Sequence, residues 1–258
     1  MEIAGRHVVV TGGASGIGRA LALRFADEGA RAVVVADLDE AGAQAVAEEA
    51  GGLGVRTDVG REEDIRELVA RAEAANGPVD LFFSNAGITG PSGGPEVLDA
   101  DWDLLWRVNT LSHVWAARAL LPGMLERGEG YLLSTASAAG LLAQLGAMGY
   151  TVTKHAAVAV AEWLAMTYGD RGIRVSCLCP QYVRTPMVTD GDLPLDKLEQ
   201  VATVLEPEQV ADAVIEAIGE ERFLILPHPE VGTYMSHRGG DHERWLRGMR
   251  RLQGLLGV

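Results

Sequence analysis

The sequence predicts an α/β fold in which helices cover both faces of one doubly wound parallel sheet of about seven strands. Short β-branched runs are almost continuously apolar, and longer amphipathic stretches alternate with them. No linker or internal repeat divides the 258 residues, of which 48% are hydrophobic, so we expect residues 1–258 to form a single domain with one large core. The apolar runs lie at residues 7–11, 31–37, 54–58, 80–85, 131–135, 173–180 and 223–227.

The stretches between these runs have a helical period. They cover residues 17–28, 40–50, 62–76, 101–127 in one or two pieces, 148–168 and 207–219. The last helix is expected to begin at Pro207, because proline is favoured in the first helical turn. The helix around Tyr150 is apolar on nearly all sides, which predicts burial by its own sheet or by a neighbouring subunit.

Charge and hydropathy argue against several classes of partner. The formal net charge is −14, whereas nucleic-acid backbones and anionic membranes attract basic surfaces. No run of eighteen apolar residues and no charged-then-apolar leader is present, so a soluble, cytoplasmic protein is expected.

The cysteines and the C-terminal histidines predict structural rather than chemical roles. Cys177 and Cys179 are the only two cysteines, which excludes a disulfide framework and favours small core residues. His228, His237 and His242 fit no recognised ligand spacing, so we expect a solvated loop there and no metal site.

A glycine-rich segment, "TGGASGIG" at residues 11–18, follows the first strand and opens a helix. Gly12, Gly16 and Gly18 allow a sharp turn, close approach of a pyrophosphate and tight packing of the helix whose amides face the phosphates. The spacing differs by one residue from the commonest dinucleotide fingerprint. This segment predicts a dinucleotide site.

Asp37 ends the second strand, about twenty residues farther on. A carboxylate there can accept hydrogen bonds from both adenosine ribose hydroxyls, and it would repel a 2′-phosphate. Ser15 and Leu38, at the positions where a basic residue could offset that repulsion, are uncharged. NAD(H) is therefore favoured over NADP(H).

Tyr150 and Lys154 stand one helical turn apart, although the chain contains only two lysines. Residues four apart share a helix face, so the ammonium group can lie beside the phenol. One such pair also arises by chance, and further motifs are needed before it indicates chemistry.

Taken together, these residues resemble the classical short-chain dehydrogenase/reductase family over essentially the whole chain. The matching motifs are "TGGASGIG", "SNAG" at 84–87, Asn109, "SAAG" at 137–140, "YTVTK" at 150–154 and "PQYVRTP" at 180–186. The resemblance implies a Rossmann-type fold, hydride transfer between NAD and an alcohol or ketone, and a homotetramer or homodimer.

The resemblance also implies catalytic roles for four residues. Tyr150 is the general acid/base, Lys154 also holds the nicotinamide ribose, and Asn109 anchors a water beside the lysine. Ser137 binds the substrate oxygen; Ser134 is a competing candidate that the S-x-x-G spacing disfavours. The implied cofactor contacts are Gly12, Ser15, Gly16, Ile17, Gly18, Asp37, Leu38, Asp58, Val59, Asn85, Ala86, Gly87, Tyr150, Lys154, Pro180, Val183 and Thr185.

The electrostatics of the Tyr150–Lys154 pair can be bounded. A free phenol has a pKa near 10, and lowering it to ~7 requires roughly 4 kcal/mol. A unit charge at about 4 Å supplies roughly that at an effective dielectric near 20. We therefore expect Lys154, with the positive nicotinamide ring, to make Tyr150 a usable base, and Ser137 to stabilise charge on the substrate oxygen.

Substrate contacts are expected beside the catalytic residues and in a lid near residues 182–205, while Gly87 to Pro95 is a second long loop. They are Ser137, Gln144, Tyr150, Gln181, Tyr182 and Met187, with Leu142, Ala143, Leu145, Met148 and Val188 as further candidates. These mostly apolar walls predict a moderately hydrophobic secondary alcohol or ketone. Gln181 replaces the glycine, and Ser84 the asparagine, that the family commonly has.

Two other functions remain open. A catalytically inactive dinucleotide-binding regulator or scaffold would keep the fold, although all four catalytic side chains are present. Enoyl reduction is a related chemistry, which the four-residue spacing of Tyr150 and Lys154 disfavours.

The C-terminal extension, residues 228–258, ends in "HERWLRGMRRLQGLLGV" with four arginines between 244 and 251. Its apolar residues at 245, 246, 249, 252, 255 and 256 predict a helix with an apolar stripe beside a basic face. We expect it to pack on a partner subunit or over the substrate opening, with membrane association as a weaker alternative.

Overall fold

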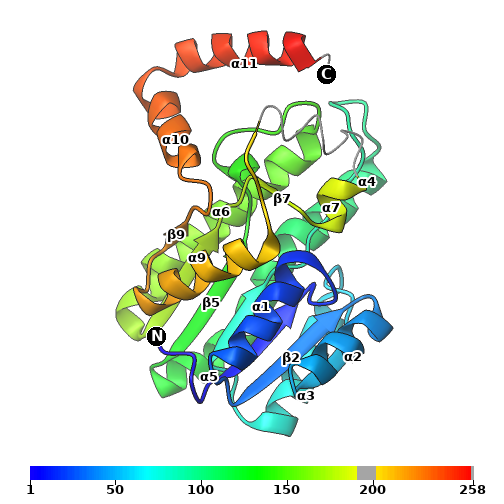
Figure 1. The fold of residues 1–258 in the computed structure, drawn as a ribbon, viewed down its shortest axis with the longest axis vertical. Helices are drawn as coiled ribbons and strands as arrows, with labels where there is room; N and C mark the ends of the chain where they lie inside the picture. Colours follow the sequence, from blue (N-terminus) through cyan, green and yellow to red (C-terminus); the bar gives the residue numbers. More distant parts are fainter. Residues whose placement is uncertain (191–201, 257–258) are drawn as a thin grey trace.

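One seven-stranded parallel sheet forms the centre of the molecule (Figure 1). The computed structural model describes residues 1–190 and 202–256. The strands are β1 (His7–Thr11), β2 (Ala32–Asp37), β3 (Leu53–Arg56), β4 (Leu81–Ser84), β5 (Gly130–Thr135), β6 (Ile173–Leu178) and β9 (Leu224–Ile225). Their order is β3-β2-β1-β4-β5-β6-β9, and every pairing is parallel. The strand order reverses between β1 and β4, so the predicted doubly wound sheet is confirmed.

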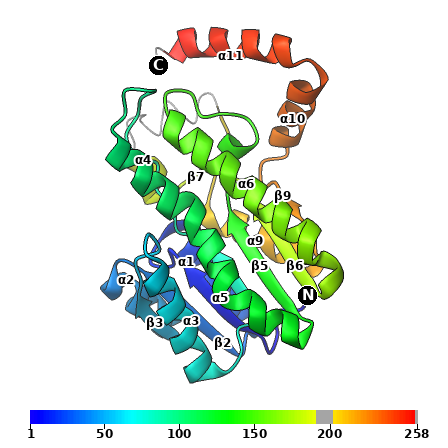
Figure 2. The same cartoon turned by 180° about the vertical axis from the view of Figure 1, so that it is seen from behind.

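Helices cover both faces of the sheet, as Figures 1 and 2 show from opposite sides. One layer contains α1 (Gly16–Asp27), α2 (Glu40–Glu49) and α9 (Pro207–Gly219), and the other contains α3 (Glu62–Asn76), α5 (Ser112–Arg127) and α6 (Met148–Tyr168). Alternate residues of β1 pack against opposite helix layers. Val8 and Val10 pack with α1 and α9, and Val9 packs with α3 and α5. This alternation explains why the strands are apolar throughout.

Local sequence sets several helix ends. Asp39 caps α2 by accepting a hydrogen bond from the Gly42 amide at 3.1 Å. The helix α9 begins at Pro207, as predicted, and Glu206 and Gln209 form a reciprocal capping box. The predicted bounds 62–76, 148–168 and 207–219 agree with the structure.

The helical stretch predicted at 101–127 contains a change of helix type. The helix α4 (Asp99–Trp106) passes into a π-helical turn (Arg107–Leu111), which leads into α5. The buried Asn109 lies in that turn. Such turns are rare and often accompany functional sites.

The burial predicted for α6 occurs on one side of the helix only. Thr153, Ala157 and Ala161 are buried against the sheet layer. On the other side, Trp163 is 55% exposed and Met166 is 77% exposed. The helix lies at the surface of its layer, so its own chain covers only the inner face.

The segment expected to form a lid contains short elements. They are β7 (Tyr182–Val183), α7 (Pro186–Thr189) and β8 (Val204–Leu205), and β7 pairs with β8. Residues 191–201 of the expected lid lie outside the described residues.

Two helices follow the sheet and stand apart from it. These are α10 (Glu230–Gly240) and α11 (His242–Leu256), which appear beyond the end of the molecule where β7 and α7 lie (Figures 1 and 2). The helix α11 packs against α10. The predicted C-terminal helix is therefore present.

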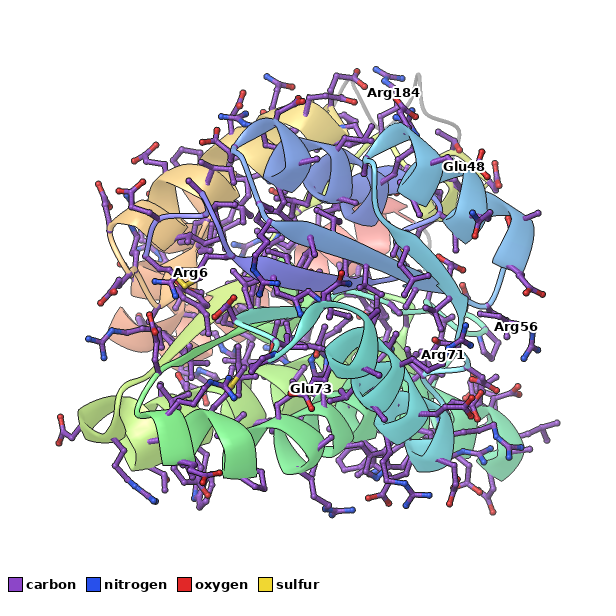
Figure 3. The ribbon with its side chains drawn as sticks, turned by 90° about the horizontal axis from the view of Figure 1, so that it is seen from below. Arg6, Glu48, Arg56, Arg71, Glu73 and Arg184 are labelled. Atoms are coloured by element: carbon purple, nitrogen blue, oxygen red, sulfur yellow. The ribbon has the colours of Figure 1, made fainter. Side chains whose placement is uncertain are left out.

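The surface and the core differ as expected. Charged side chains stand around the outside of the layers, among them Arg6, Glu48 and Glu73 in Figure 3. Cys177 and Cys179 are buried and unbonded, with their Sγ atoms 3.8 Å apart, in agreement with the predicted core role. None of the helices in the described part of the chain is long and apolar enough to cross a membrane.

Candidate active site

A cavity of about 590 Å³ opens at the carboxyl ends of the central strands. Segments that follow β1, β2, β4, β5 and β6 all contribute to it. In open α/β sheets this is where ligands bind, close to the point at which strand order reverses. Its size is in the range of small-molecule and cofactor sites.

The glycines after β1 make one wall of this cavity. Gly12 has φ +65°, and a Cβ there would lie 2.8 Å from the Ala86 Cα. A Cβ on Gly16, at φ +51°, would lie 2.8 Å from Thr185 Cγ2. A Cβ on Gly18 would lie 2.0 Å from the Gly12 carbonyl oxygen, so this glycine brings α1 against the loop and does not line the cavity itself. A cradle that only glycine permits fits the backbone approach of a pyrophosphate.

Asp37 is held at the end of β2 by two backbone amides. Its Oδ2 accepts from Ala14 at 3.0 Å, and its Oδ1 accepts from Asp39 at 3.1 Å. The carboxylate lines the cavity beside Leu38, Asp58 and Val59. Each carboxylate oxygen has a further lone pair, so the side chain can still accept hydrogen bonds from a ribose.

Asn109 does not line the cavity but ties its parts together. Its Oδ1 accepts from the Ile88 amide at 2.9 Å, and its Nδ2 donates to the Ile88 carbonyl at 2.8 Å and to Thr153 Oγ1 at 3.2 Å. The side chain thereby fixes the segment after β4 against α6. The π-helical turn places Asn109 where it can reach both.

Lys154 lines the cavity, and its side chain is almost fully buried. Its Nζ donates to the Thr135 carbonyl at 3.0 Å and lies 5.8 Å from the centre of the Tyr150 ring. Burial lowers the pKa of Lys154 to about 8. A Cβ on Gly87 would lie 3.2 Å from Nζ, so this glycine leaves room for the ammonium group.

Tyr150 and Ser137 meet on the same wall. Burial raises the pKa of the Tyr150 phenol, and the Ser137 hydroxyl opposes this by hydrogen bonding. Ser137 Oγ also accepts from the Ala139 amide at 3.1 Å. Ser134, the competing serine, lies buried on β5 and is not part of the cavity lining.

The prediction that Lys154 and the nicotinamide ring together lower the Tyr150 pKa concerns the protein with its cofactor bound; in the protein alone, burial raises the pKa of the phenol. Burial is the larger effect, and Lys154 is not among the groups that shift the pKa of the phenol. The two cations therefore have to overcome the cost of burying the phenolate as well.

The cavity contains most of the residues expected from sequence. They are Gly12, Ser15, Gly16, Ile17, Asp37, Leu38, Asp58, Val59, Asn85, Ala86, Gly87, Ser137, Tyr150, Lys154, Pro180, Gln181, Val183, Thr185, Met187 and Val188. Eight further residues line the cavity that the sequence did not single out one by one, although Ile88, Thr89 and Gly90 lie in the long loop expected at Gly87 to Pro95 and Pro186 lies in the expected lid. The other four are Thr57, Val108, Thr135 and Ala136.

Gln144 and Tyr182, expected as substrate contacts, lie outside the cavity lining, as do Leu142, Ala143, Leu145 and Met148. Gln144 is exposed, and its backbone amide and carbonyl bind Thr151 Oγ1 at 2.9 and 3.1 Å. Tyr182 pairs with Val204 in the small β7–β8 sheet.

His228 corrects the expectation of a solvated histidine loop. It is buried, its Nδ1 accepts from the Gln181 amide at 3.1 Å, and its Nε2 binds the Tyr182 carbonyl at 3.1 Å. Burial lowers its pKa, so the ring is the neutral tautomer with the proton on Nε2. The sequence could have indicated this, because His228 comes just after the β9 run and the carboxyl ends of parallel strands meet at the site.

His113, one turn after Asn109, is a second buried histidine that sequence reasoning missed. Neither ring nitrogen has a hydrogen-bond partner among the described residues. Burial, together with the positive charge of Lys154, lowers the pKa of His113 to about 3. The ring is therefore neutral at physiological pH.

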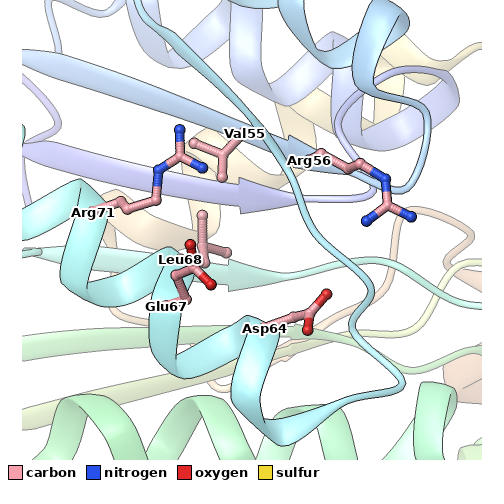
Figure 4. Close-up of a pocket in the computed structure, with 6 residues that line it drawn as sticks. All are labelled: Val55, Arg56, Asp64, Glu67, Leu68 and Arg71. Carbon is pink, nitrogen blue, oxygen red and sulfur yellow. The ribbon is translucent and has the colours of Figure 1, made fainter.

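A second cavity, of about 290 Å³, lies away from this site between β3 and α3 (Figure 4). Arg56 and Arg71 line it together with Asp64 and Glu67, so its charges balance. Within residues 1–190 and 202–256, no three His, Cys, Asp or Glu side chains come together in a way that could hold a metal ion.

Comparison with known proteins agrees with this geometry. A sequence profile described as short chain dehydrogenase matches residues 6–193. The chain belongs to the short-chain dehydrogenase family. Solved structures similar to this chain hold NAD or NADH, and the glycine cradle and Asp37 fit such a nicotinamide dinucleotide.

Several members of the family are similar over most of their length. The 1-deoxy-11-beta-hydroxypentalenate dehydrogenase of Streptomyces exfoliatus is 38% identical over 90% of this chain and 86% of its own. The cyclohexanol dehydrogenase of an Acinetobacter species is 31% identical over 88% of this chain and 94% of its own. The crystal structure of a short-chain dehydrogenase/reductase from Burkholderia phymatum in complex with NAD is 31% identical and superposes with a TM-score of 0.85, over 94% and 96% of the two chains.

Proposed function

We propose that this protein is an NAD-dependent oxidoreductase that transfers a hydride between NAD and a moderately hydrophobic secondary alcohol or ketone, with Tyr150 as the general acid/base. The observation that carries the proposal is the convergence of Tyr150, Ser137 and Lys154 on the cavity that also contains the glycine cradle and Asp37. Two relatives are dehydrogenases of a hydroxypentalenate and of cyclohexanol, which supports a hydroxyl substrate with a large apolar part.

The cofactor would lie along the strand ends. Its pyrophosphate would meet the backbone at Gly12 and Gly16, where Ser15, the N-cap of α1, makes no side-chain capping bond to the helix amides. Asp37 would accept from the adenosine ribose hydroxyls, and its charge would oppose a 2′-phosphate. This assigns the preference for NAD over NADP to one carboxylate.

The proton is moved by residues of the chain. In oxidation, Tyr150 takes the proton of the substrate hydroxyl while Ser137 donates a hydrogen bond to the same oxygen. The bound nicotinamide supplies the hydride acceptor at C4 of its ring. Lys154 binds the ribose hydroxyls and holds positive charge near the phenolate. In ketone reduction Tyr150 returns the proton.

Burial raises the pKa of the Tyr150 phenol. The free energy needed to bring that pKa near neutrality is therefore larger than for a phenol in water. Two cations, the protonated Lys154 and the oxidised cofactor, would have to supply more than the ~4 kcal/mol that separates a pKa near 10 from ~7. Because burial lowers the pKa of Lys154 to about 8, this support weakens at alkaline pH.

The proposed protein is a homo-oligomer located in the cytoplasm. A homotetramer or homodimer is consistent with the exposed Trp163 and Met166 on α6, which a second subunit would cover. A cytoplasmic location is consistent with the two unpaired buried cysteines.

Purified protein mixed with NAD⁺ or NADP⁺ and a panel of cyclic and open-chain secondary alcohols tests the proposal by the absorbance of the reduced cofactor. We expect turnover with NAD⁺ and preference for apolar ring alcohols. Tight NAD binding without turnover across the panel would instead support a dinucleotide-binding regulator. Equal use of NADP⁺ would contradict the role given to Asp37.

A further inference from the structure

The last helix, α11, has an apolar stripe that the rest of the described chain covers only in part, since Leu252 is 43% exposed while Trp245 and Met249 are half-buried. Trp245, Met249 and Leu252 follow one another at helical spacing along one side. The four arginines of the helix, Arg244, Arg247, Arg250 and Arg251, lie on the opposite side. An isolated helix of this length is marginal in water, so a partner that buries the stripe would stabilise it.

Arg238 of α10 fixes the arm formed by α10 and α11 to the rest of the protein. The guanidinium donates to the carbonyls of Leu141 and Leu142, the latter at 3.1 Å, and contacts His155 Nε2 at 3.2 Å. It also lies 5.0 Å from the centre of the Trp245 ring, at the first turn of α11. The arm is thus presented in a defined direction.

The segment from Glu96 to Trp106, which includes α4, has an exposed surface that is both acidic and apolar. Leu98 is 70% exposed, Leu104 is 45% exposed and Trp106 is 40% exposed. Glu96, Asp99 and Asp103 are exposed among them, and in the described part of the chain neither aspartate forms an ion pair with a basic side chain. This acidic and apolar surface matches the basic and apolar character of α11.

We propose that α11 of one copy of this chain packs on residues 96–106 of a second copy. Figures 1 and 2 place α11 and α4 at the same end of the molecule, so a two-fold axis there would create the contact twice. The inference rests on the homo-oligomer proposed above and names its surface. An anionic bilayer is a poorer occupant, because the whole chain carries a net charge of −14.

This contact would also reach the active site. Leu105 of α4 packs against Gly90, where a Cβ would lie 2.8 Å from Leu105 Cδ1. Gly90 lines the cofactor and substrate cavity. A second copy bound to α4 would therefore support one wall of that cavity from behind, and its loss should raise the substrate KM.

Light scattering on the full chain over a range of concentrations tests the contact. Arg247→Glu with Arg250→Glu should weaken association at least about tenfold, because like charges would then meet at the interface. Asp99→Arg with Asp103→Arg should do the same, and an equal mixture of the two charge-reversed proteins should regain association, since both contacts become complementary again. Arg66→Glu with Arg71→Glu on α3 is the matched control.

The outcomes separate the two proposals. A full chain that is monomeric at all concentrations would refute the homo-oligomer itself. An oligomer that neither pair of reversals weakens, or a mixture that does not recover, would overturn the α11 contact alone. Flotation with phosphatidylserine vesicles tests the lipid alternative. Vesicle binding that Arg247→Glu with Arg250→Glu abolishes, with no change in the molecular mass from light scattering, would assign α11 to a lipid surface and overturn the proposed contact.

Discussion

The cofactor half and the substrate half of the cavity are built differently. In the cofactor half, side chains at strand ends are held by nearby backbone: Asp37 by two amides, and Asn85 by the carbonyls of Thr11 and Gly12 at 3.1 and 3.2 Å. The substrate half depends on the segment after β6, which distant residues such as His228 hold in place. The cofactor half is thus fixed by hydrogen bonds to backbone at neighbouring strand ends, and the substrate half by a side chain that follows the edge strand β9.

The largest expected effect is at Tyr150, where the two halves meet. Tyr150→Phe removes the hydroxyl that exchanges the substrate proton and keeps the ring. We expect kcat to fall about 10²- to 10⁴-fold, the usual contribution of a general acid/base, with NAD binding changed little.

Stopped-flow turnover and fluorescence titration of NAD measure these two quantities. Tyr168→Phe, at the far end of the same helix, is the matched control and should retain activity. If Tyr150→Phe keeps full turnover, another group moves the proton and the proposed mechanism is wrong.

The next effect tests the cofactor half alone. Asp37→Asn keeps an acceptor oxygen and removes the charge that opposes a 2′-phosphate. The ratio of kcat/KM for NAD to that for NADP should fall by about 10- to 100-fold, since interactions of a few kcal/mol are expected between such charges.

Glu40→Gln removes a neighbouring carboxylate outside the cavity lining and is the control for a general change of charge. A ratio that Asp37→Asn leaves unchanged would show that cofactor choice is made elsewhere in the cavity.

A third prediction concerns His113, the buried histidine whose pKa the charge of Lys154 helps to lower. The pKa of His113 is about 3 in the folded protein and near 6.5 in the unfolded chain. Below pH 6.5 the unfolded chain takes up a proton that the folded protein does not, so stability falls as the pH falls from 6.5 to 3. At pH 5 this loss is about 2 kcal/mol.

Chemical denaturation between pH 4 and 7 measures this effect. His113→Phe should make the free energy of unfolding fall less steeply with acid, by about 1.4 kcal/mol per pH unit below 6.5. His237→Phe, in the surface helix α10, is the control. An acid slope that His113→Phe leaves unchanged would contradict the burial of a neutral ring.

The smallest effect is expected in the substrate half. His228→Phe removes the acceptor of the Gln181 amide and leaves that amide without its partner, at a cost of about 1–3 kcal/mol in stability. We expect the substrate KM to rise by about 3- to 10-fold and the KM for NAD to change less, which would sharpen the contrast between the halves.

Initial rates at several pH values measure both constants. His228→Gln offers a different acceptor and should restore part of the lost affinity. Equal increases in the two KM values would show that His228 supports the whole cavity and not the substrate half alone.

The sequence by itself determined the features that depend on local spacing. The alternation of apolar runs and helical stretches predicted the sheet and its layers. Gly12, Gly16, Asp37 and the Tyr150–Lys154 pair all lie at the cavity. These predictions succeed because turn geometry, strand ends and helix faces are set by residues a few positions apart.

Only the tertiary structure decided which groups are buried and what they touch. His228 meets Gln181 across 47 residues of sequence, Asn109 meets Thr153 across 44, and the pKa of Tyr150 is raised by the packing of the whole site. It is likewise the fold that leaves Leu246, Leu252 and Leu255 of α11 exposed. Burial and hydrogen-bond partners depend on elements far apart in the chain, and so does the free energy of every charge placed among them.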